Sequence, residues 1–334
     1  MQYKQLPVQH NERGEIRKVG FELEYANVNI EESVRIIQEL YGGKEEIEHR
    51  FSRKVTGTSI GDFSVKIDLK LLNEKTYKEP LDKLNINLQD ISIGNGTLED
   101  EVEIALESVI NKVIPYEITT PPVPFTEIEV FEKLRQTLYE HNAKGTEAFI
   151  TNAFATHINP ETPGTDAETI LRYIQAFLLL YPWLVKEGET DFARRMTAFI
   201  SPFPEEYADL VLSPEYHPDI EKLIDDYHQL NPDRNRPLDM YPLFAAIREE
   251  QVNQYRDLGN VKSRETFHYR LPNSWVSKPD WTLAREWNNW VVLEELANDP
   301  KRLAHMSKEY LALKEDTLIG FDSKWTKETG KWLT

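Results

Sequence analysis

Apolar and polar residues alternate along several short segments of the chain, and this pattern predicts β-strands. In residues 19–25, Phe21, Leu23 and Tyr25 share one face of the predicted strand. Glu22 and Glu24 lie on the opposite face. Similar runs predict further strands over residues 47–55, 63–69, 115–119, 147–159 and 266–271. We therefore expect strands with one apolar and one polar face.

Apolar residues three and four positions apart predict helices between and after these strands. The segments with this spacing are residues 30–40, 98–112, 125–141, 170–184, 220–230, 241–248, 281–297 and 302–313. Asp280 is a candidate N-cap for the helix at 281–297. Strands, then helices, then a late strand predict one α+β catalytic domain over residues 1–334, with 166–248 as a helical insertion.

The composition narrows the classes of partner. The 334 residues include 39 basic and 57 acidic side chains, which give a net charge of −18. Such a charge argues against a surface for nucleic acid or anionic membrane. The absence of cysteine excludes disulfides, thiolate metal sites and a cysteine nucleophile. The longest apolar run, residues 176–185, is about half a membrane span and contains Pro182. We expect a soluble, cytoplasmic protein.

Four of the predicted strands carry polar residues two positions apart. These pairs are Glu22 and Glu24, Glu117 and Thr119, His157 and Asn159, and His268 and Arg270. Each pair alone also fits a solvated strand or a structural ion pair. If the strands form one sheet, its polar face collects acids and histidines, which suit divalent ions such as Mg²⁺ or Mn²⁺.

Such ions would bridge nucleotide phosphates, with an arginine facing the transferred phosphoryl group. The chain has neither a P-loop nor a Gly-x-Gly-x-x-Gly motif, which argues against the folds that carry them. Asp68 lies on the polar side of the strand at 63–69 and is a weaker candidate for contact with nucleotide or substrate.

The order of these motifs resembles that of the carboxylate–amine ligases with a glutamine-synthetase-like fold, in particular the putative amidoligase family. The resemblance rests on GFELEY at 20–25, YEITTPP at 116–122, ATHINP at 155–160, FHYRLPN at 267–273 and DWTLAREW at 280–287. It implies an antiparallel sheet forming a partial barrel, with helices on one side.

The resemblance also implies roles for individual residues. Metal ligands would be Glu22, Glu24, Glu117 and His157, and Arg270 would contact the transferring phosphate as a catalytic residue. His268 stands where the family pattern has an acid, so its place among the ligands and the number of ions stay open. Asn159 and Asp68 are the expected nucleotide- or substrate-binding residues.

The implied activity is ATP- and Mg²⁺-dependent formation of an amide from a carboxylate and an amine, through an acyl phosphate. Amino acids and peptides are candidate substrates. Related synthetases often form rings, so a homo-oligomer is compatible with the resemblance. Two alternatives remain open. A metal-dependent hydrolase would use the same acids and histidines without ATP, and an inactive scaffold would bind a protein partner instead.

Overall fold

The structure, a computed structural model, describes residues 1–49, 51–67, 115–146, 154–190, 200–259, 261–317 and 319–333. The candidate residue Asp68 and the helix predicted at 98–112 lie outside these ranges.

The described strands form one nine-stranded sheet in which neighbouring strands pair antiparallel. The strands are β1 (Lys18–Tyr25), β2 (Lys44–His49), β3 (Ser52–Thr56), β4 (Phe63–Ile67), β5 (Tyr116–Thr119), β6 (Val123–Pro124), β7 (Thr156–Pro160), β8 (Leu238–Asp239) and β9 (His268–Tyr269). Their order is β2-β3-β4-β5-β1-β7-β9-β8, and β6 pairs with the start of β1. The predicted α+β class is confirmed, and the sheet is open rather than closed into a barrel.

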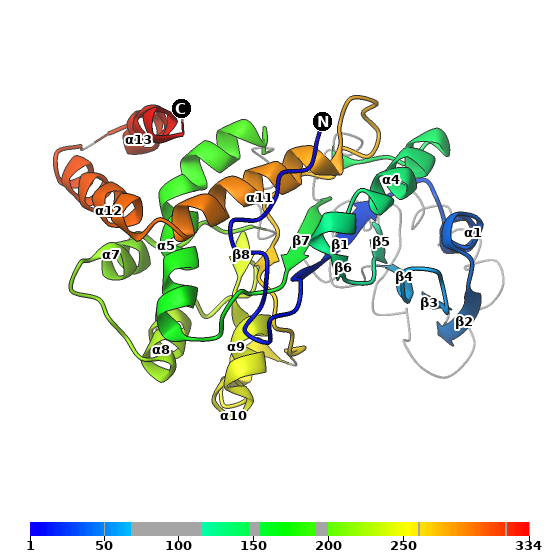
Figure 1. The fold of residues 1–334 in the computed structure, drawn as a ribbon, viewed down its shortest axis with the longest axis horizontal. Helices are drawn as coiled ribbons and strands as arrows, with labels where there is room; N and C mark the ends of the chain where they lie inside the picture. The colour runs from blue at the N-terminus through cyan, green and yellow to red at the C-terminus, as the bar shows by residue number, and fades with distance from the viewer. Residues whose placement is uncertain are drawn as a thin grey trace, which may run out of the picture.

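Several of the described helices form a separate group at one end of the molecule (Figure 1). The α-helices among the described residues are α1 (Ile30–Tyr41), α4 (Val130–Glu140), α5 (Ala167–Glu187), α7 (Glu205–Leu212), α8 (Ile220–Leu230), α9 (Tyr241–Ile247), α10 (Glu249–Val252), α11 (Leu283–Ala297), α12 (Pro300–Glu315) and α13 (Phe321–Trp332), with 3₁₀ turns η3 (Phe125–Glu127) and η5 (Arg256–Leu258). Figure 1 shows α5, α7, α8, α12 and α13 gathered at the end of the molecule away from β2, β3 and β4.

The apolar face of the sheet packs against α1 and α4. Phe21 and Leu23 are fully buried there, and Phe21 meets Phe131 of α4 edge to face at 5.7 Å between ring centroids. The side chain of Asn29 caps α1 by accepting a hydrogen bond from the Glu32 N–H at 2.8 Å. This packing leaves the opposite face of the same strands to the polar side chains.

The helical group is built on α5, whose apolar residues are mostly buried. Helices α11, α12 and α13 pack against it, and the Trp325 indole N–H donates to the carbonyl of Leu179 at 2.7 Å. A buried ion pair between Arg17 and Glu294 links the residue before β1 to α11 at 2.7 Å. The sheet and the helical group are therefore tied together close to the start of β1.

The structure corrects two local predictions. Residues 47–55 are not one strand but parts of the β2–β3 hairpin, and Ile47 is 70% exposed. The turn there contains no glycine or proline, so the sequence lacks the usual signal for a reversal of the chain. Helix α11 begins at Leu283 with Thr282, not Asp280, as the N-cap. The helices predicted at 30–40 and 170–184 are present as α1 and α5.

The segment 166–248, predicted as a helical insertion, contains α5, α7, α8 and α9 among its described residues. It also contains β8, which pairs with β9 and extends the main sheet by one strand. Among the described helices, none has the length and apolarity needed to cross a membrane.

Candidate metal centre on the polar face of the sheet

The four polar strands predicted from the sequence lie in one sheet, and their register places the polar residues on one face. Glu22 on β1 pairs with Thr119 on β5 on one side and with His157 on β7 on the other. Glu24 pairs with Glu117. Residues directly opposite in an antiparallel pair point to the same face, so these side chains meet above the sheet.

Glu22 is the centre of this group and is almost fully buried, with 7% of its surface exposed. Its Oε2 lies 2.8 Å from His157 Nδ1 and 3.9 Å from His268 Nε2. Its Oε1 accepts hydrogen bonds from Asn159 Nδ2 at 3.0 Å and from Arg264 Nη1 at 3.2 Å. One carboxylate thus contacts side chains from two strands and a loop.

Burial and neighbouring charge act in opposite directions on this carboxyl group. Burial raises the pKa of Glu22. Electrostatic attraction to His268 and Arg264 and the hydrogen bond from His157 outweigh burial, and they hold that pKa well below its ordinary value. Burial lowers the pKa of His268 well below its ordinary value, against the pull of Glu22. The lowered pKa favours the neutral imidazole of His268, which is the form that binds a metal ion.

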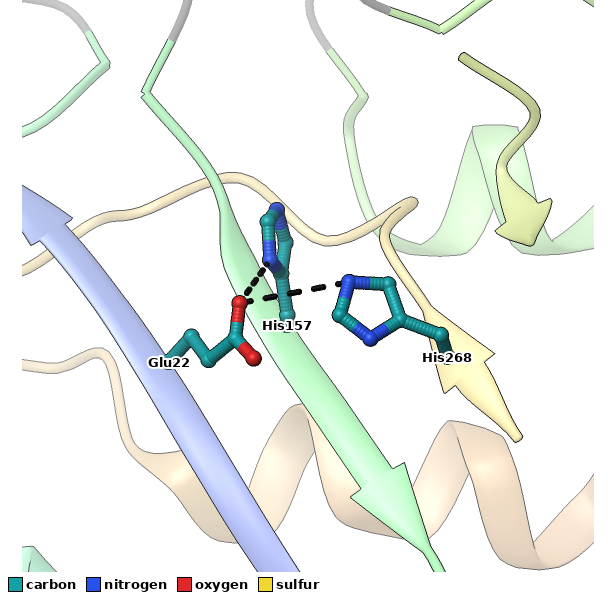
Figure 2. A group of neighbouring side chains, drawn as sticks. All are labelled: Glu22, His157 and His268. Carbon is teal, nitrogen blue, oxygen red and sulfur yellow. Dashed lines mark hydrogen bonds and ion pairs between the residues drawn. The ribbon is translucent and has the colours of Figure 1, made fainter. Parts of the chain in front are cut away.

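Three side chains bring potential ligand atoms together in this part of the molecule. One atom each from Glu22, His157 and His268 lies within 4.8 Å of the other two. Figure 2 shows these side chains converging from β1, β7 and β9, with both imidazoles turned toward the Glu22 carboxylate. The arrangement can hold one divalent ion.

Two buried polar atoms support this interpretation. Asn159 Oδ1 and His268 Nδ1 have no hydrogen-bond partner among the described residues. Because the amide nitrogen of Asn159 donates to Glu22, its oxygen is left as an acceptor. Buried polar atoms usually have a partner. An ion or a bound substrate group near Asn159 would supply one.

The remaining predicted acids lie beside this group rather than in it. Glu24 Oε2 accepts the Ala155 N–H at 2.7 Å, and Glu24 Oε1 lies 3.6 Å from His157 Nε2. Glu117 Oε1 pairs with Lys66 Nζ at 2.9 Å and accepts a hydrogen bond from the Thr119 hydroxyl. Metal binding by Glu24 and Glu117 therefore stays a prediction.

Arg270 follows directly after β9, two positions from His268. Its Nη1 donates to the carbonyl of Arg234 at 2.8 Å. Asp239 on β8 pairs with His268 in the register and is 2% exposed. Burial raises the pKa of Asp239, while the nearby Arg234 and Arg270 partly oppose this rise. The predicted contact of Arg270 with a phosphate stays a prediction.

Three residues at this face escaped the sequence interpretation: Lys66, Arg264 and Asp239. Lys66 lies on the polar side of the same alternating segment as Asp68. The alternation therefore indicated the position of Lys66, but only Asp68 was taken as a candidate binding residue. Arg264 lies outside the named strands and helices, and β8 has only two residues, so neither Arg264 nor Asp239 belongs to a readable periodic pattern.

A protein-family model described as "Putative amidoligase enzyme" matches residues 15–292. The matched range includes Glu22, His157 and His268, the candidate metal-binding group. No curated protein and no solved structure matches the chain.

Proposed function

We propose, from the premise that this chain belongs to the putative amidoligase family, that it is an ATP-dependent carboxylate–amine ligase. In the proposed reaction, a substrate carboxylate oxygen attacks the γ-phosphorus of ATP, the bond from that phosphorus to ADP breaks, and ADP leaves as an acyl phosphate forms. An amine then attacks the acyl carbon, inorganic phosphate leaves, and the amine loses a proton to give the amide. Amino acids and peptides are the expected substrate class.

The observation that supports this proposal most directly is the convergence of Glu22, His157 and His268 within 4.8 Å on the polar face. A divalent ion bound there would neutralise the charge on phosphate oxygens. Two imidazoles and one carboxylate suit Mn²⁺ better than Mg²⁺, because Mg²⁺ prefers oxygen ligands while Mn²⁺ accepts both. We therefore expect activity with either ion and tighter binding of Mn²⁺.

The protein's own side chains have separate tasks in this proposal. Glu22 and the two histidines would hold the ion, and Asn159 keeps the Glu22 carboxylate in place through its 3.0 Å hydrogen bond. Arg264 contacts Glu22 directly and its side chain is 38% exposed, so it can face both the ion site and a bound anion. Arg270 would stabilise charge on the transferring phosphoryl group.

Isothermal titration with a non-hydrolysable ATP analogue, with and without Mg²⁺ or Mn²⁺, tests the proposal. We expect binding that requires the ion and is lost in Glu22→Gln. Glu39→Gln, an exposed acid on α1, is the matched control and should bind like wild type. Release of ADP in the presence of mixed amino acids or peptides would then identify substrates.

The same titration separates the alternatives. Metal binding that is indifferent to nucleotide would favour a metal-dependent hydrolase. An absence of both metal and nucleotide binding would contradict the ligase proposal and favour a scaffold.

A further inference from the structure

A single row of paired residues crosses the polar face and connects the metal-binding group to the far edge of the sheet. The register pairs Glu46 with Lys54, Lys54 with Ser64, and Ser64 with Thr119. Thr119 in turn pairs with Glu22, and Glu22 with His157. Neighbouring strands lie about 4.8 Å apart. Thr119 is therefore one strand spacing from the centre of the metal-binding group.

An open hollow of about 530 Å³ lies over the β2–β5 part of this row. Its lining includes Glu46, Lys54, Ser64 and Thr119 from the row itself. The remaining lining residues are Thr56, Asp62, Phe63, Thr120, Pro121 and Pro122. The volume is within the range of small-molecule sites, and the hollow opens onto the same face as Glu22.

The lining offers both signs of charge beside hydroxyl groups. Lys54 carries an ammonium group on a side chain that is 47% exposed, and its Nζ contacts Glu48 at 2.6 Å. Glu46 accepts a hydrogen bond from the Thr56 hydroxyl at 2.8 Å, and Asp62 accepts the Gly57 N–H at 2.9 Å. These groups match a small molecule with one positive and one negative end.

The same lining is poorly suited to a nucleobase. Phe63 is its single aromatic residue, and that side chain is only 1% exposed because it packs in the core against Tyr41 and Phe131. No aromatic ring among the lining residues is thus available for stacking. The chemistry favours a zwitterion over a nucleoside.

We infer that this hollow binds the zwitterionic end of the substrate, an amino acid or a short peptide. Lys54 with the Ser64 hydroxyl faces the carboxylate of the bound end, and Glu46 and Asp62 face its ammonium group. The row of paired residues then directs the reacting group toward Glu22. That the bound molecule is a substrate rests on the proposed ligase function.

Binding of dipeptides without ATP or metal tests the inference. The probes are alanylalanine, alanylglutamate and alanyllysine at millimolar concentration, measured by NMR saturation transfer and titration. An N-acetylated, C-amidated alanylalanine is the uncharged comparison. We expect at least one zwitterionic dipeptide to bind and the blocked dipeptide not to bind.

Lys54→Gln should weaken dipeptide binding about tenfold, as expected for loss of a charged hydrogen bond. Lys133→Gln, an exposed lysine on α4 behind the sheet, should leave binding unchanged.

Two results would overturn the inference. One is an absence of binding of all three dipeptides to the wild-type protein. The other is a Lys54→Gln variant that binds dipeptide as tightly as the wild-type protein; if this variant has also lost affinity for the ATP analogue, the hollow is a nucleotide site. Glu22→Gln separates this inference from the ligase proposal, because it should lose metal-dependent ATP binding and retain dipeptide binding. If the wild-type protein binds dipeptide but no nucleotide, the inference about the hollow is supported and the proposed ligase function is contradicted.

Discussion

Replacement of Arg17 by methionine should destabilise the protein strongly, although Arg17 is remote from the proposed chemistry. Arg17 Nη1 and Nη2 each lie 2.7 Å from an oxygen of Glu294, and both side chains are fully buried. Arg17 also donates to the carbonyls of Val8 and Glu161. Burial lowers the pKa of Arg17, but the charge and hydrogen bonds of Glu294 more than compensate and raise it, so the guanidinium stays charged.

The magnitude follows from what each replacement leaves behind. Loss of one partner from a buried ion pair costs roughly 3–5 kcal/mol. In Arg17→Met, Glu294 keeps hydrogen bonds from Tyr173 at 2.9 Å and Trp290 at 2.7 Å, so we expect the lower figure, about 3 kcal/mol. Glu294→Leu removes the acceptor of all these donors and should cost about 5 kcal/mol. A chain of this size loses ~2 °C in Tm per kcal/mol, so Tm should fall by about 6 °C in Arg17→Met and by about 10 °C in Glu294→Leu.

Urea unfolding, followed by circular dichroism and tryptophan fluorescence, measures these losses. The double variant Arg17→Met with Glu294→Leu should lose less than the sum of the single variants, because the isolated charge is absent. Arg13→Met is the control, since Arg13 pairs with Glu265 at an exposed site and should matter far less. An Arg17→Met variant that loses under about 1 kcal/mol, or a fully additive double variant, would refute this account.

Three further predictions concern the site and the helical group. Mn²⁺ at about 100 times its Kd should stabilise the wild-type protein by about 2.7 kcal/mol in thermal unfolding, and excess chelator should reverse this. Glu22→Gln should abolish the shift, and a retained shift would exclude Glu22 as a ligand. Arg270→Ala should reduce turnover about 10²- to 10³-fold in an ADP-release assay with the fold intact; unchanged kinetics in a folded variant would remove the proposed role. Asp166 caps α5 by accepting the Thr169 N–H at 2.9 Å, so Asp166→Ala should cost about 1 kcal/mol at pH 7. Burial raises the pKa of Asp166, but its hydrogen bonds with Thr169 outweigh this and lower it from 3.8. The stabilisation is therefore present above pH 3.8 and is lost as the pH falls through the lowered pKa, so the Tm values of wild type and variant should converge in acid. A difference in Tm that persists in acid would contradict the capping argument.

Local periodicity was sufficient to predict the polar face of the sheet. The alternation around Glu22 and Glu24 depends on residues two positions apart, and this spacing determines which side of a strand they occupy. The same reasoning assigned His157 and His268 to polar faces of their strands. Their convergence followed from the assumption of one sheet, which the strand order bears out.

The features that were missed depend on long-range packing. The backbone N–H of Arg264 donates to the carbonyl of Pro242, and its guanidinium reaches Glu22, a residue 242 positions earlier. The two residues of β8 become a strand because β9 offers them a pairing edge, which gives Asp239 its place opposite His268. The β2–β3 turn was missed because its residues have no strong turn preference. These outcomes arise from tertiary contacts that local patterns do not encode.

The three converging side chains come from distant parts of the chain, and this has a consequence for biosynthesis. Glu22 and His157 are 135 positions apart, and His268 follows on a third strand. During translation β1 is made early, but the candidate metal-binding group is complete only after β9 has left the ribosome and joined the sheet. Such distant pairings form late and slowly. Incorporation of an ion would then mark a chain whose sheet is complete, and truncated products ending before β9 would remain without it.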